Sequence, residues 1–339
     1  MHHLGYIRQK TLHIVLLWVT CLSLLHTRDA MAQSLTEKAE STIRTNPWTI
    51  PGPFRVGETN GSVDGAFDVY VKYPVQGGTR RPVVLFFNGF QSRYTWYSTL
   101  LDAVASWGFV TVQYQLPTMS MMSIEAELKT YYKPLMSWIS KGGLQDLLDP
   151  ISTTKVDINS IFSSGHSRGG KMASLVFTED DDLPVPLIQA AFLIDPVDSS
   201  GFAPISTENP SAVASLSASG KEIAVVGASI VGSCNPVQGN YKKFYAAGAP
   251  GSWQIVLNGT SHSQFAIAGG LFDMISDSLC GKGTQSRAEI ANTVASSMVS
   301  WFTQNGNAVK AFKDCVMKNF YIGIESRMRL KDLTFSIKV

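Results

Sequence analysis

One short motif constrains the fold of this chain more than any other feature. An apolar stretch, residues 160–162, runs into Gly165-x-Ser167-x-Gly169, and a helix-forming stretch, residues 171–177, follows. This order is typical of a nucleophile elbow, a tight turn between a strand and a helix that holds a serine oxygen over the edge of a sheet. Glycines are needed because the turn strains the serine backbone and leaves no room for neighbouring side chains. The motif therefore predicts that Ser167 is a nucleophile.

A second pattern overlaps the elbow and points to a different class of protein. Gly165-x4-Gly170-Lys171 resembles a phosphate-binding loop. The next residue is Met172, where such a loop needs a Ser or Thr to hold magnesium. A nucleotide site is therefore disfavoured.

Apolar stretches of strand length alternate with amphipathic stretches of helix length around the elbow. We expect strands at residues 69–73, 83–87, 109–114, 160–162, 190–194, 223–227 and 253–257, and helices at residues 97–107, 124–139, 171–177 and 287–302. Residues 69–73 alternate as an edge strand should, whereas residues 83–87 are continuously apolar, as in a strand covered on both faces. This alternation predicts an α/β fold with a mainly parallel central sheet and helices on both faces.

The two ends of the chain differ from its centre. Arg8 and Lys10 precede an apolar run of residues 12–25, and Ala30-Met31-Ala32 offers a cleavage site, so residues 1–32 are predicted to be a signal peptide. Residues 33–54 are interpreted as an N-terminal lead-in, residues 55–316 as the catalytic domain, and residues 317–339 as a tail of unassigned role. A signal peptide implies entry into the secretory pathway, with an extracellular or endomembrane destination or a plastid reached through that route.

Charge and cysteine content exclude some classes of partner and leave one question open. The chain has 28 basic and 26 acidic side chains, and it has no basic patch or charge run, which disfavours nucleic acid as a partner. Beyond residue 32 three cysteines remain, Cys234, Cys280 and Cys315. They permit one disulfide and one free thiol, and the sequence does not choose the pair. The sequence also leaves the oligomeric state of the protein undetermined.

A serine hydroxyl needs a base, and the histidine census identifies one. Four of the six histidines lie in residues 1–32, which leaves His166 and His262. The side chain next to an elbow serine points away from the nucleophile, so His166 is an unsuitable base. His262 follows the strand expected at residues 253–257, and we predict that it is the base.

An acid should hold the histidine ring, and the chain order Ser, acid, His is expected for this arrangement. No Asp or Glu lies between Glu222 and Asp273, so the strand at residues 223–227 cannot supply the acid from its own end. The preceding strand ends in Asp195-Pro196-Val197-Asp198. Asp195 is our first choice because it comes immediately after the strand, and Asp198 is the alternative.

The negative oxygen that forms during attack should be stabilised by two backbone N–H groups. One belongs to Arg168, directly after the nucleophile, and the other to Phe90, in the loop after residues 83–87. This chemistry requires neither a metal nor an organic cofactor.

Three segments together resemble the chlorophyllase family of α/β-hydrolases. They are the stretch of residues 82–90 that ends in Asn88-Gly89-Phe90, the elbow Gly165-His-Ser-Arg-Gly-Gly170, and the stretch of residues 193–198 that contains Asp-Pro-Val-Asp. The resemblance covers roughly residues 60–305. The family usually has His where this chain has Asn88, and its catalytic histidine commonly has other neighbours than the Ser-His-Ser found around His262.

The resemblance implies a carboxylic ester hydrolase that cleaves the phytyl ester of chlorophyll, giving chlorophyllide and phytol through an acyl-enzyme. It maps the family's nucleophile, acid and base onto Ser167, Asp195 and His262. The expected partner is a lipophilic ester such as chlorophyll or a related pigment, reached through contact with a membrane surface. One alternative is a secreted carboxylesterase or lipase for other lipophilic esters. Another is a hydrolase-like binding protein without catalysis.

Overall fold

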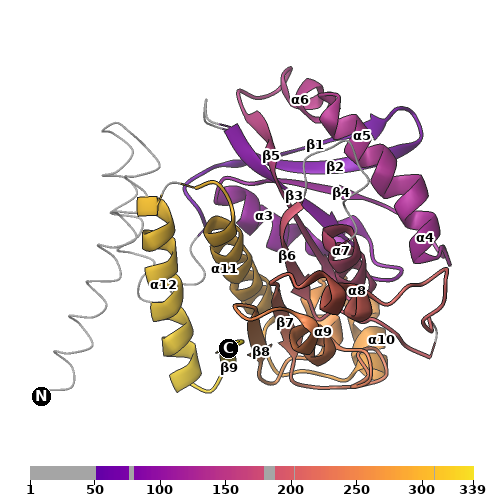
Figure 1. The fold of residues 1–339 in the computed structure, drawn as a ribbon, viewed down its shortest axis with the longest axis vertical. Helices are drawn as coiled ribbons and strands as arrows, with labels where there is room; N and C mark the ends of the chain where they lie inside the picture. The colour runs from indigo at the N-terminus through magenta and orange to yellow at the C-terminus, as the bar shows by residue number, and fades with distance from the viewer. Residues whose placement is uncertain (1–50, 76–79, 179–187, 202, 309) are drawn as a thin grey trace, which may run out of the picture.

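The computed structural model describes residues 51–75, 80–178, 188–201, 203–308 and 310–339. The predicted signal peptide, residues 1–32, and most of the lead-in lie outside these residues. In the described part of the chain, nine strands form one sheet in the order β1-β2-β4-β3-β5-β6-β7-β8-β9 (Figure 1). Their bounds are β1 Val56–Val63, β2 Phe67–Pro74, β3 Arg80–Phe87, β4 Val110–Tyr114, β5 Lys155–His166, β6 Ile188–Ile194, β7 Ala224–Ala228, β8 Trp253–Leu257 and β9 Leu333–Ile337.

The central strands are parallel, as the alternation of strands and helices predicted. The pairs β4–β3, β3–β5, β5–β6, β6–β7 and β7–β8 are all parallel. The pairs β1–β2, β2–β4 and β8–β9 at the two sides are antiparallel. The prediction of a mainly parallel α/β sheet is therefore confirmed.

Helices cover both faces of the sheet because side chains of the buried strands alternate between two cores. Along β3, Val83, Leu85 and Phe87 belong to one core, and Val84 and Phe86 to the other. The first core packs against α4 (Ile124–Glu127), α5 (Lys133–Ser140), α6 (Gly143–Leu148), α7 (Arg168–Thr178), α8 (Ala212–Ser219) and α9 (Tyr241–Ala247). The second packs against α3 (Ser98–Ser106), α11 (Arg287–Asn305) and α12 (Lys310–Arg329).

The expectation of an edge strand at residues 69–73 is wrong. These residues lie in β2, which is flanked by β4 on one side and by β1 on the other. The sequence pattern does not predict β1, because Gly57, Asn60 and Gly61 are unfavourable in strands and only Val63 at its end is fully buried. Burial of alternate residues in β2 reflects a sheet with one partly solvated face rather than an edge.

The end of the chain, which the sequence left unassigned, completes the sheet. Helix α12 packs on α11, and β9 then pairs with β8, so that Leu333 lies opposite Leu257 and Ile337 opposite Trp253. Residues 317–339 are thus part of the same sheet-and-helix body as the elbow.

One helix that the sequence predicts as continuous contains an irregular turn. Residues 124–139 were expected to form one helix, and the chain is helical from Ile124 to Ser140. Its middle, η3 (Leu128–Tyr132), is a π-helix turn. Such turns are frequent beside functional sites.

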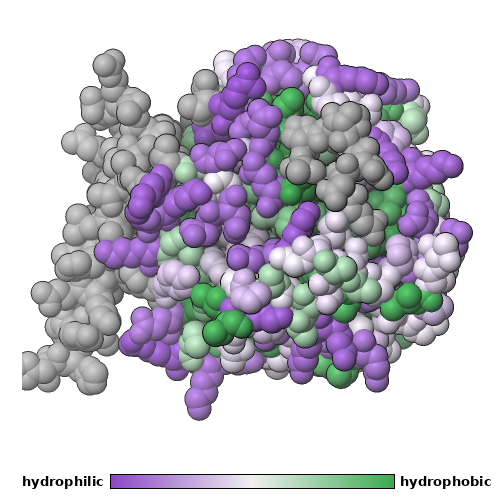
Figure 2. Space-filling model, in the orientation of Figure 1, coloured by the Kyte–Doolittle hydropathy of each residue, from purple (hydrophilic) through white to green (hydrophobic). Residues whose placement is uncertain are grey.

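The face of the molecule in Figure 2 is mostly hydrophilic, with hydrophobic residues exposed in small separate groups. Within the described residues, no helix combines the length and the apolar character needed to cross a membrane.

Candidate active site

Ser167 lies in the turn between β5 and α7, with the strained backbone that the elbow motif predicts. Its φ angle is +59°, and its N–H donates to the Ile194 carbonyl at 2.9 Å. A Cβ atom at Gly169 would lie 2.0 Å from the Phe87 carbonyl oxygen, and one at Gly165 would lie 2.3 Å from the Gly169 carbonyl oxygen. Glycine is required at both positions because backbone atoms occupy the space.

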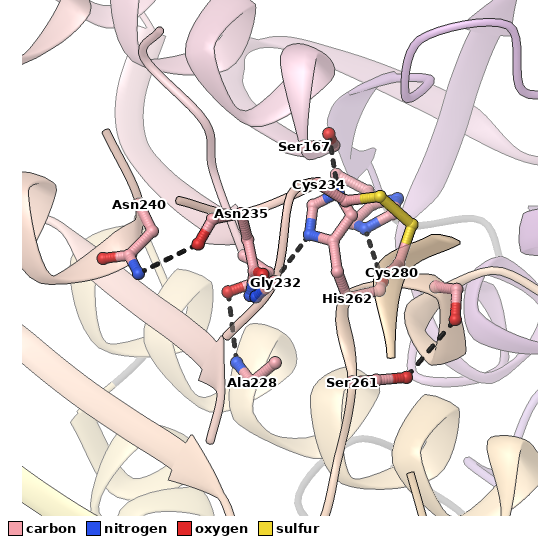
Figure 3. Close-up of polar contacts among 12 residues, drawn as sticks. Ser167, Ala228, Gly232, Cys234, Asn235, Asn240, Ser261, His262 and Cys280 are labelled. Atoms are coloured by element: carbon pink, nitrogen blue, oxygen red, sulfur yellow. Dashed lines mark hydrogen bonds and ion pairs between the residues drawn. A yellow bond between two sulfur atoms is a disulfide. The ribbon is translucent and has the colours of Figure 1, made fainter. Parts of the chain in front are cut away.

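The structure brings Ser167, His262 and Asp195 into one hydrogen-bonded chain. Figure 3 shows the bond between Ser167 and His262. His262 begins the short helix η5 (His262–Phe265) after β8, and Asp195 directly follows β6. The His262 Nδ1 atom lies 2.7 Å from Asp195 Oδ2, and Nε2 lies 2.9 Å from Ser167 Oγ. Since the carboxylate can only accept, Nδ1–H donates to it, and Nε2 is left to accept the Ser167 proton.

Asp195 is completely buried, and two further groups stabilise its charge. The Ala228 N–H donates to Oδ1 at 3.1 Å, and the Asn235 side-chain amide donates to Oδ2 at 3.0 Å. Asn235 is itself held, because its Oδ1 accepts from the Gly232 N–H at 2.8 Å. Sequence reasoning missed Asn235, since nothing in the stretch around it distinguishes it from an ordinary loop residue.

Asp198, the alternative acid, has a different role. Its carboxylate accepts from the Ser211 hydroxyl and from the Ala212 N–H, both at 2.7 Å, and so holds the first turn of α8. Lys171 Nζ lies 3.6 Å from the same carboxylate. Asp198 therefore organises the start of α8 and is not the partner of His262.

Both ring nitrogens of His166 bond to groups other than Ser167, and these bonds connect two loops of the site. Its Nε2–H donates to the His262 carbonyl at 3.1 Å, so its Nδ1 accepts from the Tyr97 hydroxyl at 3.0 Å. That hydroxyl in turn accepts from the Gly89 N–H at 3.1 Å. Burial, and then the neighbouring His262, lower the pKa of His166 well below its usual value, and burial raises the pKa of Tyr97 to about 12. The path from Gly89 to His262 is therefore uncharged.

Phe90 and Arg168, which carry the expected oxyanion donors, line one cleft together with Asn88, Met122 and Glu127. Arg168 is the first residue of α7, where an N–H group has no acceptor within the helix. The Gly89 N–H is already bonded to Tyr97, which leaves the amide of Phe90 as the next donor in that loop. Both predicted residues thus border this cleft, and Arg168 directly follows Ser167 in the sequence.

The Arg168 side chain forms a partly buried ion pair on the wall of this cleft. Its guanidinium pairs with Glu127 and also donates to the Met122 carbonyl at 2.8 Å. Glu127 accepts a second bond from the Tyr114 hydroxyl at 2.6 Å, and burial together with this carboxylate raises the pKa of Tyr114 well above its usual value. The π turn of η3 begins directly after Glu127.

The structure answers the question of cysteine pairing for two of the three cysteines. Cys234 and Cys280 form a disulfide, while the side chain of Cys315 lies outside what the structure describes. Cys280 ends α10 (Gly270–Cys280), and Cys234 immediately precedes Asn235. The disulfide thus joins α10 to the loop that supports Asp195. Among the described residues, no group of three or more His, Cys, Asp or Glu side chains is placed to hold a metal ion.

The sheet order, the elbow and the hydrogen-bonded Ser, His and Asp define the α/β-hydrolase class of proteins. A sequence model of the chlorophyllase family matches residues 52–319, and the chain belongs to that family. It is similar to Chlorophyllase-2 of Arabidopsis thaliana, with 34% identity over 132 residues that cover 39% of this chain and 40% of the relative. It is also similar to Chlorophyllase-1 of Arabidopsis thaliana, with 36% identity over 110 residues that cover 32% of each chain. These matches span less than half the length of either relative.

Proposed function

We propose that this chain is a serine ester hydrolase that cleaves the phytyl ester of chlorophyll, releasing chlorophyllide and phytol. The observation that carries the proposal is the Ser167–His262–Asp195 chain, set on an elbow in a member of the chlorophyllase family. The names of the two Arabidopsis relatives support the choice of chlorophyll as substrate.

The reaction is a two-step acyl transfer. His262 Nε2 takes the proton of the Ser167 hydroxyl as its oxygen attacks the ester carbonyl, and Asp195 stabilises the imidazolium that results. The N–H groups of Phe90 and Arg168 stabilise the negative oxygen, with the N-terminus of α7 adding partial positive charge. His262 then gives the proton to the departing phytol, and the same base activates the water that cleaves the acyl-enzyme.

Removal of the nucleophile tests the mechanism. Ser167→Ala should lower hydrolysis of chlorophyll a and of a soluble p-nitrophenyl ester by several orders of magnitude, while thermal unfolding stays cooperative. Ser62→Ala, on the exposed surface of β1, is the matched control and should keep full activity. Near-full turnover by Ser167→Ala would remove this serine from the mechanism.

A substrate panel tests the second half of the proposal. The wild-type chain should release chlorophyllide from chlorophyll a faster than it releases fatty acid from triolein. Hydrolysis of triolein or short acyl esters without any chlorophyllide release would contradict the pigment substrate and leave the proposed serine chemistry standing.

A further inference from the structure

Helix α10 carries its apolar side chains on the outside. Within it, five large hydrophobic residues are each between 47% and 65% exposed: Leu271, Phe272, Met274, Ile275 and Leu279. Four of them follow the spacing i, i+3, i+4, i+8, which places them on one face of a helix. A surface helix of a globular protein normally turns such a face toward the core.

The charged side of the same helix packs against the body of the protein, where two aspartates share one arginine. Arg287 at the start of α11 pairs with Asp273 at 3.3 Å and with Asp277 at 2.7 Å. Asp277 also accepts from the Ser263 hydroxyl at 2.8 Å, directly beside His262. Because the disulfide at Cys280 holds the other end, the helix cannot turn its apolar face inward without breaking these contacts.

A second group of exposed apolar residues lies on two loops that line the cleft at Arg168. Met119 and Met121, in the loop after β4, are 77% and 73% exposed, and Phe90, in the loop after β3, is 48% exposed. Phe90 lines the cleft itself, as do Thr118, Ser120 and Met122 of the β4 loop. Both loops leave the carboxyl ends of parallel strands, the same edge of the sheet from which the elbow and the His262 loop emerge.

We propose that the exposed face of α10, with the apolar loop residues Phe90, Met119 and Met121, docks on an uncharged lipid bilayer and presents the cleft to it. The inference rests on the proposed function, since an ester of a long-chain alcohol resides in a lipid phase. Apolar side chains that project from separate elements suit a fluid interface, whereas a protein partner needs a matched surface. Helix α10 carries two carboxylates and no basic side chain, which favours zwitterionic over anionic lipid.

Fluorescence quenching by brominated phosphatidylcholine vesicles locates the contact. An indole introduced by Met274→Trp in the full chain should be quenched when vesicles are added, beyond the quenching of the wild-type tryptophans. Met328→Trp is the matched control, since Met328 is an exposed methionine on α12, and α12 and α10 lie on opposite sides of the molecule (Figure 1). No extra quenching at position 274 would overturn the proposal, whether the face stays in water or another part of the chain covers it.

Kinetics separate this inference from the proposed function. The variant Leu271→Ser/Met274→Ser/Leu279→Ser should hydrolyse chlorophyll in phosphatidylcholine vesicles at least tenfold more slowly than wild type, and a soluble p-nitrophenyl ester at the wild-type rate. The control Met328→Ser/Leu330→Ser should match wild type on both substrates.

Of three further outcomes, two would count against the docking surface. Equal rates for wild type and the α10 variant on vesicle-bound chlorophyll would overturn it while leaving the proposed function intact. Failure of wild type on both substrates would overturn the proposed function instead. A lipid-free dimer that the α10 substitutions convert to a monomer would assign the face to a second copy of the chain.

Discussion

At the scale of single residues, a buried aspartate is held in place by three hydrogen-bond donors. Asp195 is bonded to His262, to the Ala228 N–H and to the Asn235 amide, and has no exposed surface. Hydrogen bonds to a charged group contribute about 1.5–3 kcal/mol each. Asn235 is therefore a positioning residue for the proposed acid.

Asn235→Ala should lower kcat by roughly tenfold to a hundredfold and leave KM nearly unchanged, because the amide acts on Asp195 and not on substrate. Steady-state kinetics on a soluble ester measure both constants. Asn240→Ala is the control, since the Asn240 amide donates to the Asn235 carbonyl at 3.2 Å without contacting Asp195. It should reduce stability with little change in kcat. Equal losses of kcat in the two variants would reduce Asn235 to a structural role.

His166 makes stability depend on pH, and the direction follows from its lowered pKa. Its folded pKa lies well below the ordinary value of about 6.5. As the pH falls below about 6.5, His166 binds a proton in the unfolded chain before it does so in the folded chain. The stabilisation is therefore complete above about pH 6.5 and is lost toward lower pH, by at most about 1.4 kcal/mol per pH unit.

Urea unfolding between pH 7 and pH 5 tests this assignment. His166→Gln should be less stable than wild type at pH 7 by about 1–3 kcal/mol, because the bonds to Tyr97 and to the His262 carbonyl are lost. The difference should narrow as pH falls, since the variant has no proton to gain at this position. Parallel pH dependences in the two proteins would show that His166 is not the group responsible.

At the scale of elements, the disulfide links a helix at the surface to the loop behind the proposed acid. Cys234 and Cys280 are 46 residues apart in sequence, and the Ser233 hydroxyl next to Cys234 donates to the Leu279 carbonyl at 2.8 Å. The end of α10 and the Asn235 loop are thus joined by a covalent bond and a hydrogen bond.

Cys234→Ser/Cys280→Ser should lower the free energy of unfolding by about 2–4 kcal/mol, because the unfolded chain is no longer cross-linked. It should also lower kcat on a soluble ester, because Asn235 loses its anchored neighbour. Thermal unfolding with and without reductant supplies the control: reductant should lower the Tm of wild type and leave that of the double variant unchanged. If reductant lowered the Tm of both proteins equally, the loss of stability could not be assigned to the Cys234–Cys280 disulfide.

At the scale of the whole molecule, the last residues of the chain close one side of the sheet. The Phe320 ring of α12 stacks on Trp253 of β8, with ring centroids 4.9 Å apart and an angle of 10° between the planes. Phe335 of β9 packs against both rings. The second hydrophobic core therefore depends on the terminal segment.

Phe320→Ala should destabilise the protein by about 3–5 kcal/mol, since it empties a buried site between α12 and β8. Lys318→Ala, at an exposed position of the same helix, should change stability by less than about 0.5 kcal/mol. Denaturant unfolding of both variants measures the difference. Similar small effects would mean that the terminal segment contributes little to the core.

Local patterns predicted the central part of the fold well, and long-range contacts explain the rest. The bounds expected for the strands at residues 109–114, 223–227 and 253–257 lie within one residue of those of β4, β7 and β8. The strands expected at residues 83–87 and 190–194 lie inside β3 and β6. The strands β1 and β9 were missed because each pairs with a partner on one side only and lacks a strong apolar pattern of its own.

The sequence by itself determined the position of the elbow serine and the histidine that could bond to it, because the elbow is a local motif and only His166 and His262 remain beyond residue 32. Only the tertiary structure showed that the partner of His262 is Asp195 and not Asp198, which lies three residues further along the same loop. It also determined that Asn235 donates to Asp195, that Cys234 pairs with Cys280, and that the apolar face of α10 is exposed. Each of these depends on contacts between segments distant along the chain, and periodicity and spacing carry no record of such contacts.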